Sequence, residues 1–181
     1  MNIQHIKKST LQPALWQGGQ TFEYLIFPPN SKYTERNFDM RISSATIETV
    51  PSLFTQFDGY QRYLVMLDST LNIVHNGSKE QYEEGDLFAF ESNALIESFS
   101  IGSDFNLMLK KGIEAKVTIE TELEHSQEAK YIVLFALQQS TIMINQVTYL
   151  LEKTDCLWIE QKDIETIAIK VSGKVVLAMW N

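Results

Sequence analysis

The chain has 181 residues, 44% of them hydrophobic, and a formal net charge of −8. It is long enough for one or two compact domains, and its acidic charge argues against a nonspecific surface for nucleic acid or anionic membrane. The single cysteine, Cys156, excludes an internal disulfide, and no apolar run of about 18 residues predicts a membrane helix. We therefore expect a cytoplasmic protein with neither nucleic acid nor membrane as a partner.

Short apolar or alternating segments predict strands along the whole chain. Asn76-Gly77, directly after one of these segments, is the strongest hairpin signal. No segment shows a long 3.6-residue period, so the prediction is an all-β fold with little helix. In chain order, the expected strands are 24–27, 41–50, 63–67, 71–75, 87–90, 96–101, 116–119, 131–136, 141–145, 156–160, 164–171 and 175–179.

A weak internal repeat relates the two halves of the chain. The apolar segments 63–66 and 131–134 are each followed by a hairpin-like stretch and then by an Asp in a tight turn before another strand, at 84–91 and 153–160. An Asp in a tight turn before a strand is a common element of cupin barrels, and two such units about 70 residues apart indicate a duplicated small barrel. Any two all-β halves also share such features to some degree. We expect barrels at 1–113 and 114–181, packed as one compact unit, with the acidic run 114–130 at their junction.

The sequence predicts neither a metal centre nor a cofactor. A cupin metal site needs closely spaced His residues together with a carboxylate, whereas His5, His75 and His125 lie far apart in the chain. Cys156 stands in an apolar run, which favours a buried and inert thiol. No phosphate-binding loop, dinucleotide fingerprint or nucleophile elbow is present.

Polar residues within apolar strands are the candidates for a binding site. If 104–109 is a strand, Asp104, Asn106 and Met108 share one face, because side chains alternate along a strand. Arg41 and Arg62 also stand in apolar surroundings, and a buried guanidinium needs partners. Each can pair with an internal carboxylate, such as Glu23 or Asp104, or with the carboxylate of a ligand. The sequence leaves both alternatives open.

Four segments, in the same order, resemble the HutD/Ves family. They are Trp16 to Glu23 followed by Phe27-Pro28-Pro29, Phe38 to Ala45, Phe54 to Arg62, and Asp104 to Gly112. The first has a turn about two residues shorter than usual and lacks the usual Asn. Met40, Thr55 and Asp58 replace the family's Trp, Ser and Pro. Beyond Gly112 the resemblance is only general.

The resemblance implies a metal-free bicupin whose N-terminal half holds a pocket. It implies binding of a small acidic metabolite, such as formylglutamate or a related acid, in the sensing or regulation of histidine or amino-acid catabolism, without turnover. A homodimer is also plausible, because edge strands of cupin barrels often pair between subunits. The expected ligand-binding residues are Trp16, Thr21, Glu23, Arg41, Ser43, Phe57, Arg62, Asp104, Asn106 and Met108.

Two other functions fit the same residues. A metal-independent isomerase or hydrolase of a small polar metabolite would use Glu23 or Asp104 as general base, with an arginine stabilising negative charge. An interaction module with a vestigial pocket would instead have both arginines paired with internal carboxylates and no cavity.

Overall fold

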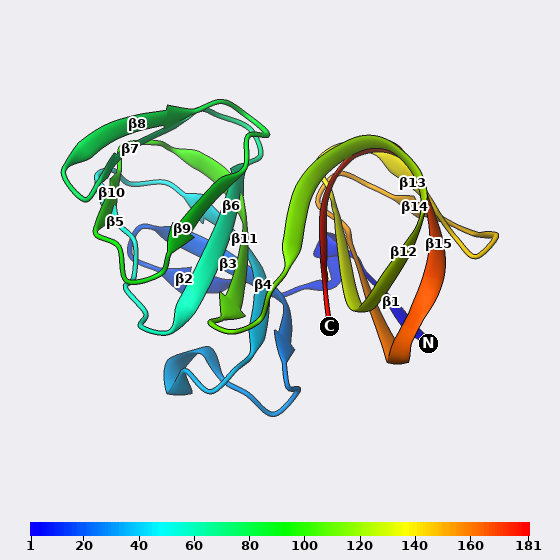
Figure 1. Ribbon diagram of the computed structural model, residues 1–181. Coiled ribbons are helices and arrows are strands. Elements are labelled where there is room, and N and C mark those ends of the chain that lie inside the picture. The colour runs from blue at the N-terminus through cyan, green and yellow to red at the C-terminus, as the bar shows by residue number, and fades with distance from the viewer. The chain divides into compact units, whose positions relative to one another are not determined.

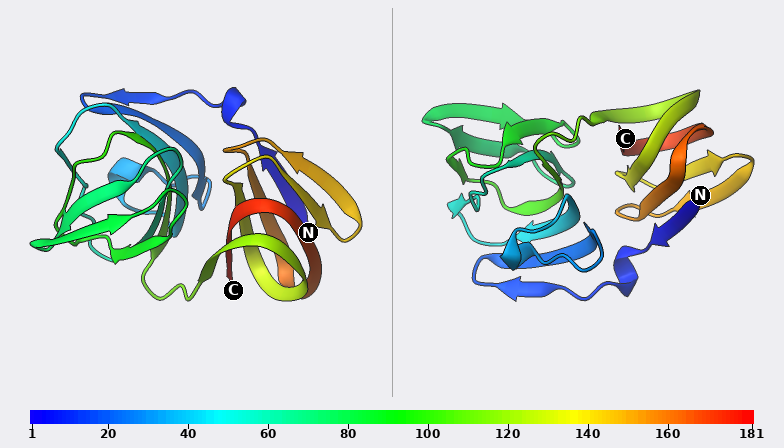
Figure 2. Two further views of the ribbon diagram at one scale, coloured as in Figure 1. Left: turned by 90° about the horizontal axis from the view of Figure 1, so that it is seen from above. Right: turned by 60° about the horizontal axis from the view of Figure 1, so that its bottom comes forward.

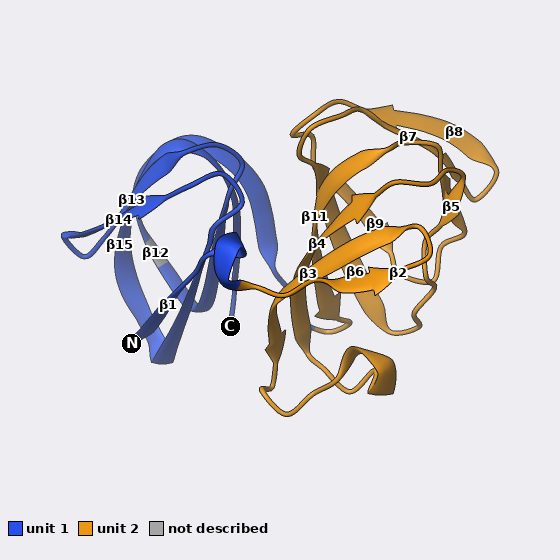
Figure 3. Ribbon diagram, turned by 180° about the vertical axis from the view of Figure 1, so that it is seen from behind, with its two compact units in different colours: residues 1–10, 113–181 blue, residues 11–112 orange. Residues whose placement is uncertain are grey.

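The computed structural model describes residues 1–181, except for the side chains of His125 and Gln127. Strands make up 64% of the chain and helix 3%, which confirms the all-β prediction (Figure 1). The helix consists of two short 3₁₀ turns, η1 (Lys8–Thr10) and η2 (Tyr33–Glu35). The chain forms two compact units, residues 11–112 and residues 1–10 with 113–181, which Figure 3 colours separately.

The first unit, residues 11–112, contains two antiparallel sheets that curl towards a barrel. Its larger sheet has the strand order β2-β3-β4-β11-β6-β9, and its smaller sheet has the order β5-β10-β7-β8. The larger sheet consists of β2 (Ala14–Trp16), β3 (Gly19–Phe27), β4 (Met40–Ile47), β11 (Gly102–Lys110), β6 (Tyr60–Met66) and β9 (Phe88–Glu91). The smaller consists of β5 (Ser52–Leu53), β10 (Ile96–Ser98), β7 (Leu71–His75) and β8 (Ser78–Tyr82).

Local sequence accounts for the hairpin between β7 and β8. Asn76 and Gly77 both have positive φ, 49° and 87°, and His75 pairs directly with Ser78. A two-residue hairpin turn with positive φ at both positions favours Asn-Gly, because glycine adopts this conformation without a steric penalty. The hairpin predicted from these two residues is therefore confirmed.

Apolar residues fill two regions of this first barrel. One cluster lies around Phe88, Leu64 and Ile96, and another around Phe38, Phe57, Tyr60 and Met108. Between them, the inner face of the larger sheet carries polar and charged side chains.

The second unit contains one five-stranded sheet with two very long strands. Its strand order is β1-β15-β13-β14, and β12 also pairs with β15 (Figure 2). Its strands are β1 (Asn2–Ile6), β12 (Lys116–Ala136), β13 (Ser140–Ile144), β14 (Val147–Leu151) and β15 (Cys156–Trp180). A core of Ile, Leu, Val, Ala and Met fills this barrel.

The acidic run 114–130 is largely a strand and not a junction, so that prediction was wrong. Residues 116–136 form one continuous strand, and its acidic part pairs with 165–172 of β15. Likewise, the three separate strands predicted between 156 and 179 form a single strand, β15. The charged side chains Glu122, Glu124 and Glu128 are exposed, so the backbone can continue its ladder while the carboxylates remain in water.

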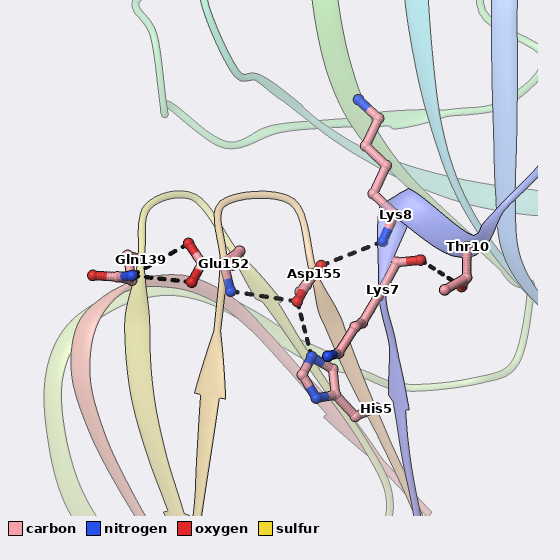
Figure 4. Close-up of polar contacts among 7 residues, drawn as sticks. All are labelled: His5, Lys7, Lys8, Thr10, Gln139, Glu152 and Asp155. Atoms are coloured by element: carbon pink, nitrogen blue, oxygen red, sulfur yellow. Dashed lines mark hydrogen bonds and ion pairs between the residues drawn. The ribbon is translucent and has the colours of Figure 1, made fainter.

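Residues 1–10 belong to the second unit, whereas the sequence-based division assigned them to the first. Strand β1 pairs with the start of β15, from Asn2 with Glu160 to Ile6 with Cys156. Figure 4 shows how the buried Asp155 holds this segment. Its carboxylate lies 2.9 Å from His5 Nε2 and accepts hydrogen bonds from the backbone N–H groups of Lys8 and Glu152.

Equivalent backbone hydrogen bonds support the duplication of the barrel. The N–H of Gly85 donates to the carbonyl of Met66 at 2.9 Å, and the N–H of Thr154 donates to that of Ala136 at 2.7 Å. Gly85 and Thr154 also share a positive φ, 83° and 75°. In both turns the backbone N–H of the following Asp donates to the carbonyl three residues earlier, from Asp86 to Glu83 and from Asp155 to Glu152. The expected repeat is therefore visible in the geometry.

Candidate functional site

One cavity of about 430 Å³ lies within the first barrel. Two other hollows of similar volume lie among described residues, one beside the ion pair Lys170–Glu124 and one over β7 and β8. Neither of these has a buried charged side chain among its lining residues. The first-barrel cavity has three, Arg41, Arg62 and Asp104, and is therefore the candidate site.

Three adjacent strands place the polar floor of the cavity. Strand β11 lies between β4 and β6, and its Asn106 is directly opposite Ser43 on β4 and Leu64 on β6. Residues two positions apart face the same side of a sheet, so Asp104 and Asn106 of β11 both reach the cavity. This confirms the shared face that alternation predicted for these two side chains.

Arg41 is held by an internal carboxylate. Its Nε donates to Glu23 Oε2 at 2.7 Å and its Nη1 donates to Ser43 Oγ at 3.0 Å. The guanidinium also lies 4.2 Å from the centre of the Tyr33 ring. Three partners fix this side chain, and Glu23 balances its charge.

Arg62 lacks such a counter-charge. It is 9% exposed, and its Nε and Nη1 donate long hydrogen bonds to Asn106 Oδ1, at 3.3 Å, and to the Thr55 carbonyl, at 3.4 Å. The guanidinium carbon lies 5.4 Å and 5.1 Å from the ring centres of Phe54 and Phe90. Burial lowers the pKa of Arg62, and Asp104 is the carboxylate that partly opposes this shift. Within the part of the chain that the structure describes, no carboxylate forms an ion pair with Arg62.

Asp104 is a buried carboxyl group with one hydrogen bond. Its Oδ1 accepts from the backbone N–H of Ala45 at 2.9 Å. Burial raises the pKa of Asp104 from 3.8 to about 6, although the Ala45 N–H and the charges of Arg62 and Arg41 act in the opposite direction. This group therefore changes its charge near neutral pH, which places it among candidate acid–base or pH-sensing groups.

The exposed edge of the cavity differs from its charged floor. Leu15 of β2 and Leu53 of β5 are among its lining residues and are 79% and 69% exposed, but register places both side chains on the outer faces of their sheets. Trp16 is 44% exposed, and its indole Nε1 donates to Thr21 Oγ1 at 3.1 Å. The cavity thus combines a charged floor with an exposed aromatic side chain at its edge.

The structure brings together seven of the ten predicted ligand-binding residues. The other three do not line the cavity: Glu23 supports Arg41, while Phe57 and Met108 pack together in the apolar cluster with Phe38 and Tyr60. Phe57 and Met108 therefore have a packing role, and their predicted contact with a ligand stays a prediction. The residues that do line the cavity are Trp16, Thr21, Arg41, Ser43, Arg62, Asp104 and Asn106.

Sequence reasoning missed several lining residues. Tyr33 comes from the turn η2, and Leu53 and Phe54 come from the short strand β5 and the loop after it. Phe54 stood in one of the quoted motifs but was not assigned to the site. A signal was available in the run of aromatic residues around Arg62, since guanidinium groups stack on aromatic faces.

No three side chains of His, Cys, Asp and Glu gather closely enough to hold a metal ion, among those whose positions are described. His75 lies 3.0 Å from Glu80, and His5 lies beside Asp155 in the other unit. The side chain of His125 is outside the described residues. Cys156 is buried, as expected, and burial raises the pKa of its thiol.

Comparison with known proteins identifies the family. The sequence model of the HutD family matches residues 8–179, nearly the whole chain. The chain belongs to the HutD family. No curated protein matches it.

Solved structures share the fold of this HutD-family protein. HutD from Pseudomonas fluorescens SBW25 is 20% identical, with a TM-score of 0.85, covering 99% of this chain and 98% of that one. A conserved protein of unknown function from Pseudomonas aeruginosa PAO1 is also 20% identical, with a TM-score of 0.86 and full coverage of both chains. The bacterial pirin YhhW from Escherichia coli, in complex with nickel(II), is 13% identical, covers 99% of this chain and 98% of that one, and has a TM-score of 0.65. The cupin-like barrel prediction is thereby confirmed.

A membrane span requires a helix that is both long and apolar, and the described helices are the short turns η1 and η2. None of them meets both requirements.

Proposed function

We propose that the first barrel binds a small carboxylic acid, whose carboxylate pairs with Arg62. The observation that carries this proposal is a buried guanidinium that lines a cavity and forms no ion pair among the described residues. A buried charge is costly unless it is paired, and a planar guanidinium can donate two parallel hydrogen bonds to a carboxylate. An acidic ligand would supply the missing partner.

The charges of the floor favour an anion of this kind. Arg41 and Glu23 balance each other at 2.7 Å, which leaves Arg62 and Asp104 as the remaining charged groups. When Asp104 is protonated the floor has a net positive charge, and the protonated carboxyl can itself donate a hydrogen bond to a ligand oxygen. The solved HutD from Pseudomonas fluorescens SBW25 is described under a formate condition, and formate is the smallest carboxylic acid.

The biological part of the proposal is a sensing or regulatory role in histidine or amino-acid catabolism, without turnover. It is supported by membership of the HutD family and by the resemblance of the four sequence segments. The interaction module with a vestigial pocket is less favoured, because that reading required both arginines to be paired internally and no cavity to exist. Here a cavity exists and only Arg41 is paired with a carboxylate.

A metal-independent enzyme is the second candidate, and one observation favours it. Asp104 lines the cavity and has a pKa near 6, which suits a general acid or base at neutral pH. Glu23 is the weaker candidate base, because it is bound to Arg41 and does not line the cavity. Turnover of a small acid that is lost in Asp104→Asn would favour the enzyme over the sensor.

Arg62→Met tests the proposal. Thermal unfolding of the wild type should shift upwards with formate, glutarate, formylglutamate or urocanate, because a ligand that binds only the folded state stabilises it. Arg62→Met should weaken the affinity for the best of these acids by about 100-fold, which corresponds to the loss of charge-assisted hydrogen bonds. The variant itself should unfold within about 1 kcal/mol of the wild type, since replacing a poorly paired buried charge by an apolar side chain is often neutral or stabilising.

Arg36→Met is the matched control. Arg36 is exposed, stacks on Phe57 at 4.3 Å and does not line the cavity, so its removal should leave the affinity unchanged. Equal binding by wild type and Arg62→Met, or equal losses in the two variants, would contradict the proposal.

A further inference from the structure

The exposed Trp16 at the edge of the cavity indicates which group a ligand carries besides its carboxylate. Single exposed apolar residues are common on proteins and need no explanation. Here the exposed Trp16 lies on the same face of the sheet as Thr21 and Ala45, and all three line the cavity. An exposed aromatic side chain that faces a cavity is suited to contact a ligand.

The ring of Trp16 is fixed in place, although it is exposed. The hydrogen bond from its Nε1 to Thr21 orients the indole. Its six-membered ring also lies directly on Gly18, where a Cβ atom would overlap ring carbon Cζ3. Only glycine leaves room for this arrangement. An aromatic face held on two sides at the edge of a cavity is a preorganised stacking surface.

The volume of the cavity exceeds what a very small acid would fill. At roughly 30 Å³ for each water, about 430 Å³ corresponds to about 14 waters, and a carboxylate replaces only a few of them. The remaining space extends from Arg62 towards side chains that offer apolar contact and few charges. A second carboxylate there would lose hydration without gaining a cationic partner, because Arg41 is already bound to Glu23.

We infer that the ligand is a monocarboxylic acid with a flat apolar group, such as an aromatic ring on a short chain. Its carboxylate pairs with Arg62, and its ring stacks on the indole of Trp16. This inference rests on the proposed function and adds the chemical class of the ligand. It also sets this class against a dicarboxylate or a strongly polar acid.

The test compares 3-phenylpropanoate with glutarate, two acids that differ at the end opposite the shared carboxylate. Calorimetric titration of the wild type should give about tenfold tighter binding of 3-phenylpropanoate, from ring stacking together with apolar burial. Binding of the aryl acid should also change the fluorescence of Trp16. The change can be assigned to Trp16, because the other two tryptophans, Trp158 and Trp180, are buried in the other unit at 1% and 6% exposure.

Three variants examine the role of the Trp16 ring. Trp16→Ala removes the ring and Gly18→Ala displaces it, so both should reduce the preference for the aryl acid to threefold or less while glutarate binding stays unchanged. Trp16→Phe keeps an aromatic face and should retain most of the preference. Phe99→Ala removes another exposed aromatic of the same unit, which does not line this cavity, and should change neither affinity.

The possible results distinguish a failure of this inference from a failure of the proposed function. Glutarate binding as tightly as 3-phenylpropanoate, or Trp16→Ala weakening both acids equally, would overturn the inference. If glutarate binding then still depends on Arg62, the proposed carboxylate site stands without it. If neither acid depends on Arg62, the proposed function fails as well.

Discussion

The two barrels of this protein share a backbone pattern but differ in what they contain. Arg62 pairs with Met108 and Phe90 across neighbouring strands, while Ile132 pairs with Met179 and Ile159. Asn106 lies opposite Leu64, as Leu177 lies opposite Leu134. Asp104 lies opposite Met66, as Val175 lies opposite Ala136. Arg62, Asp104 and Asn106 of the first barrel therefore correspond to Ile132, Val175 and Leu177 of the second.

This difference shows how one fold can provide both a packed core and a cavity with a polar floor. In the second barrel the corresponding side chains are apolar and fully buried, and they join its core. In the first barrel, polar groups at these positions leave a cavity of about 430 Å³. Function lies in a small set of side chains at fixed places on the fold, and here the duplicated barrel supplies an internal reference.

The largest expected loss of stability comes from placing an arginine at Ile132, the position of the second barrel that corresponds to Arg62. Ile132→Arg would bury a guanidinium in an apolar core without a partner, so we expect a loss of at least 4 kcal/mol, on the order of the most severe single substitutions. Denaturant unfolding followed by the fluorescence of Trp158 and Trp180, both in this unit, measures it. Ile132→Val is the size control and should cost about 1 kcal/mol. If Ile132→Arg were as stable as this control, the two interiors would not differ as described.

The pH dependence of stability should identify Asp104 as the titrating group of the polar barrel. In the folded protein the carboxyl group of Asp104 stays protonated up to a pH of about 6, whereas in the unfolded chain it loses its proton near pH 3.8. The folded state therefore binds more protons between these values, and its stability falls as the pH rises through this window, by about 3 kcal/mol. The difference in unfolding free energy between wild type and Asp104→Asn, measured at pH 4 and pH 7, isolates this contribution. An equal difference at both pH values would show that Asp104 titrates normally.

Breaking the Arg41–Glu23 ion pair should have the smallest effect. Glu23 is 42% exposed at its side chain, and ion pairs that reach solvent contribute little. Arg41 also keeps Ser43 and the Tyr33 ring. Glu23→Gln should therefore cost less than about 1 kcal/mol in chemical denaturation. A loss of more than 2 kcal/mol would mean that the pair is an essential part of the polar interior.

Alternation and the cost of burying charge were enough to predict part of the site. Asp104 and Asn106 follow from the two-residue period of a strand, and Arg41 and Arg62 stand out because charged residues are rare in apolar strands. Phe57 and Met108 were assigned to ligand contact, yet they pack with Phe38 and Tyr60. Their motif position gives no indication of which layer of the barrel they occupy.

The rest of the cavity depends on contacts between distant segments. Tyr33, Leu53 and Leu15 come from short elements whose approach to β4 and β6 is set by the folded sheets, not by local sequence. The predicted strand boundaries were wrong where charged residues were interpreted as the end of a strand. The acidic residues of 120–128 interrupt an apolar pattern, but the backbone ladder with β15 continues through them.

The N-terminal strand β1 places a particular demand on synthesis of the chain. The first barrel is complete once Gly112 has left the ribosome, because residues 11–112 contain all of its strands. Strand β1 emerges before this barrel, but its partner residues Cys156–Glu160 emerge long after it. Only the remainder of β15 and the last residue follow them. At about 5–20 residues per second, the roughly 50 residues after Gly112 take several seconds to appear. During that interval β1 stays attached to a finished barrel while its own sheet is still being made.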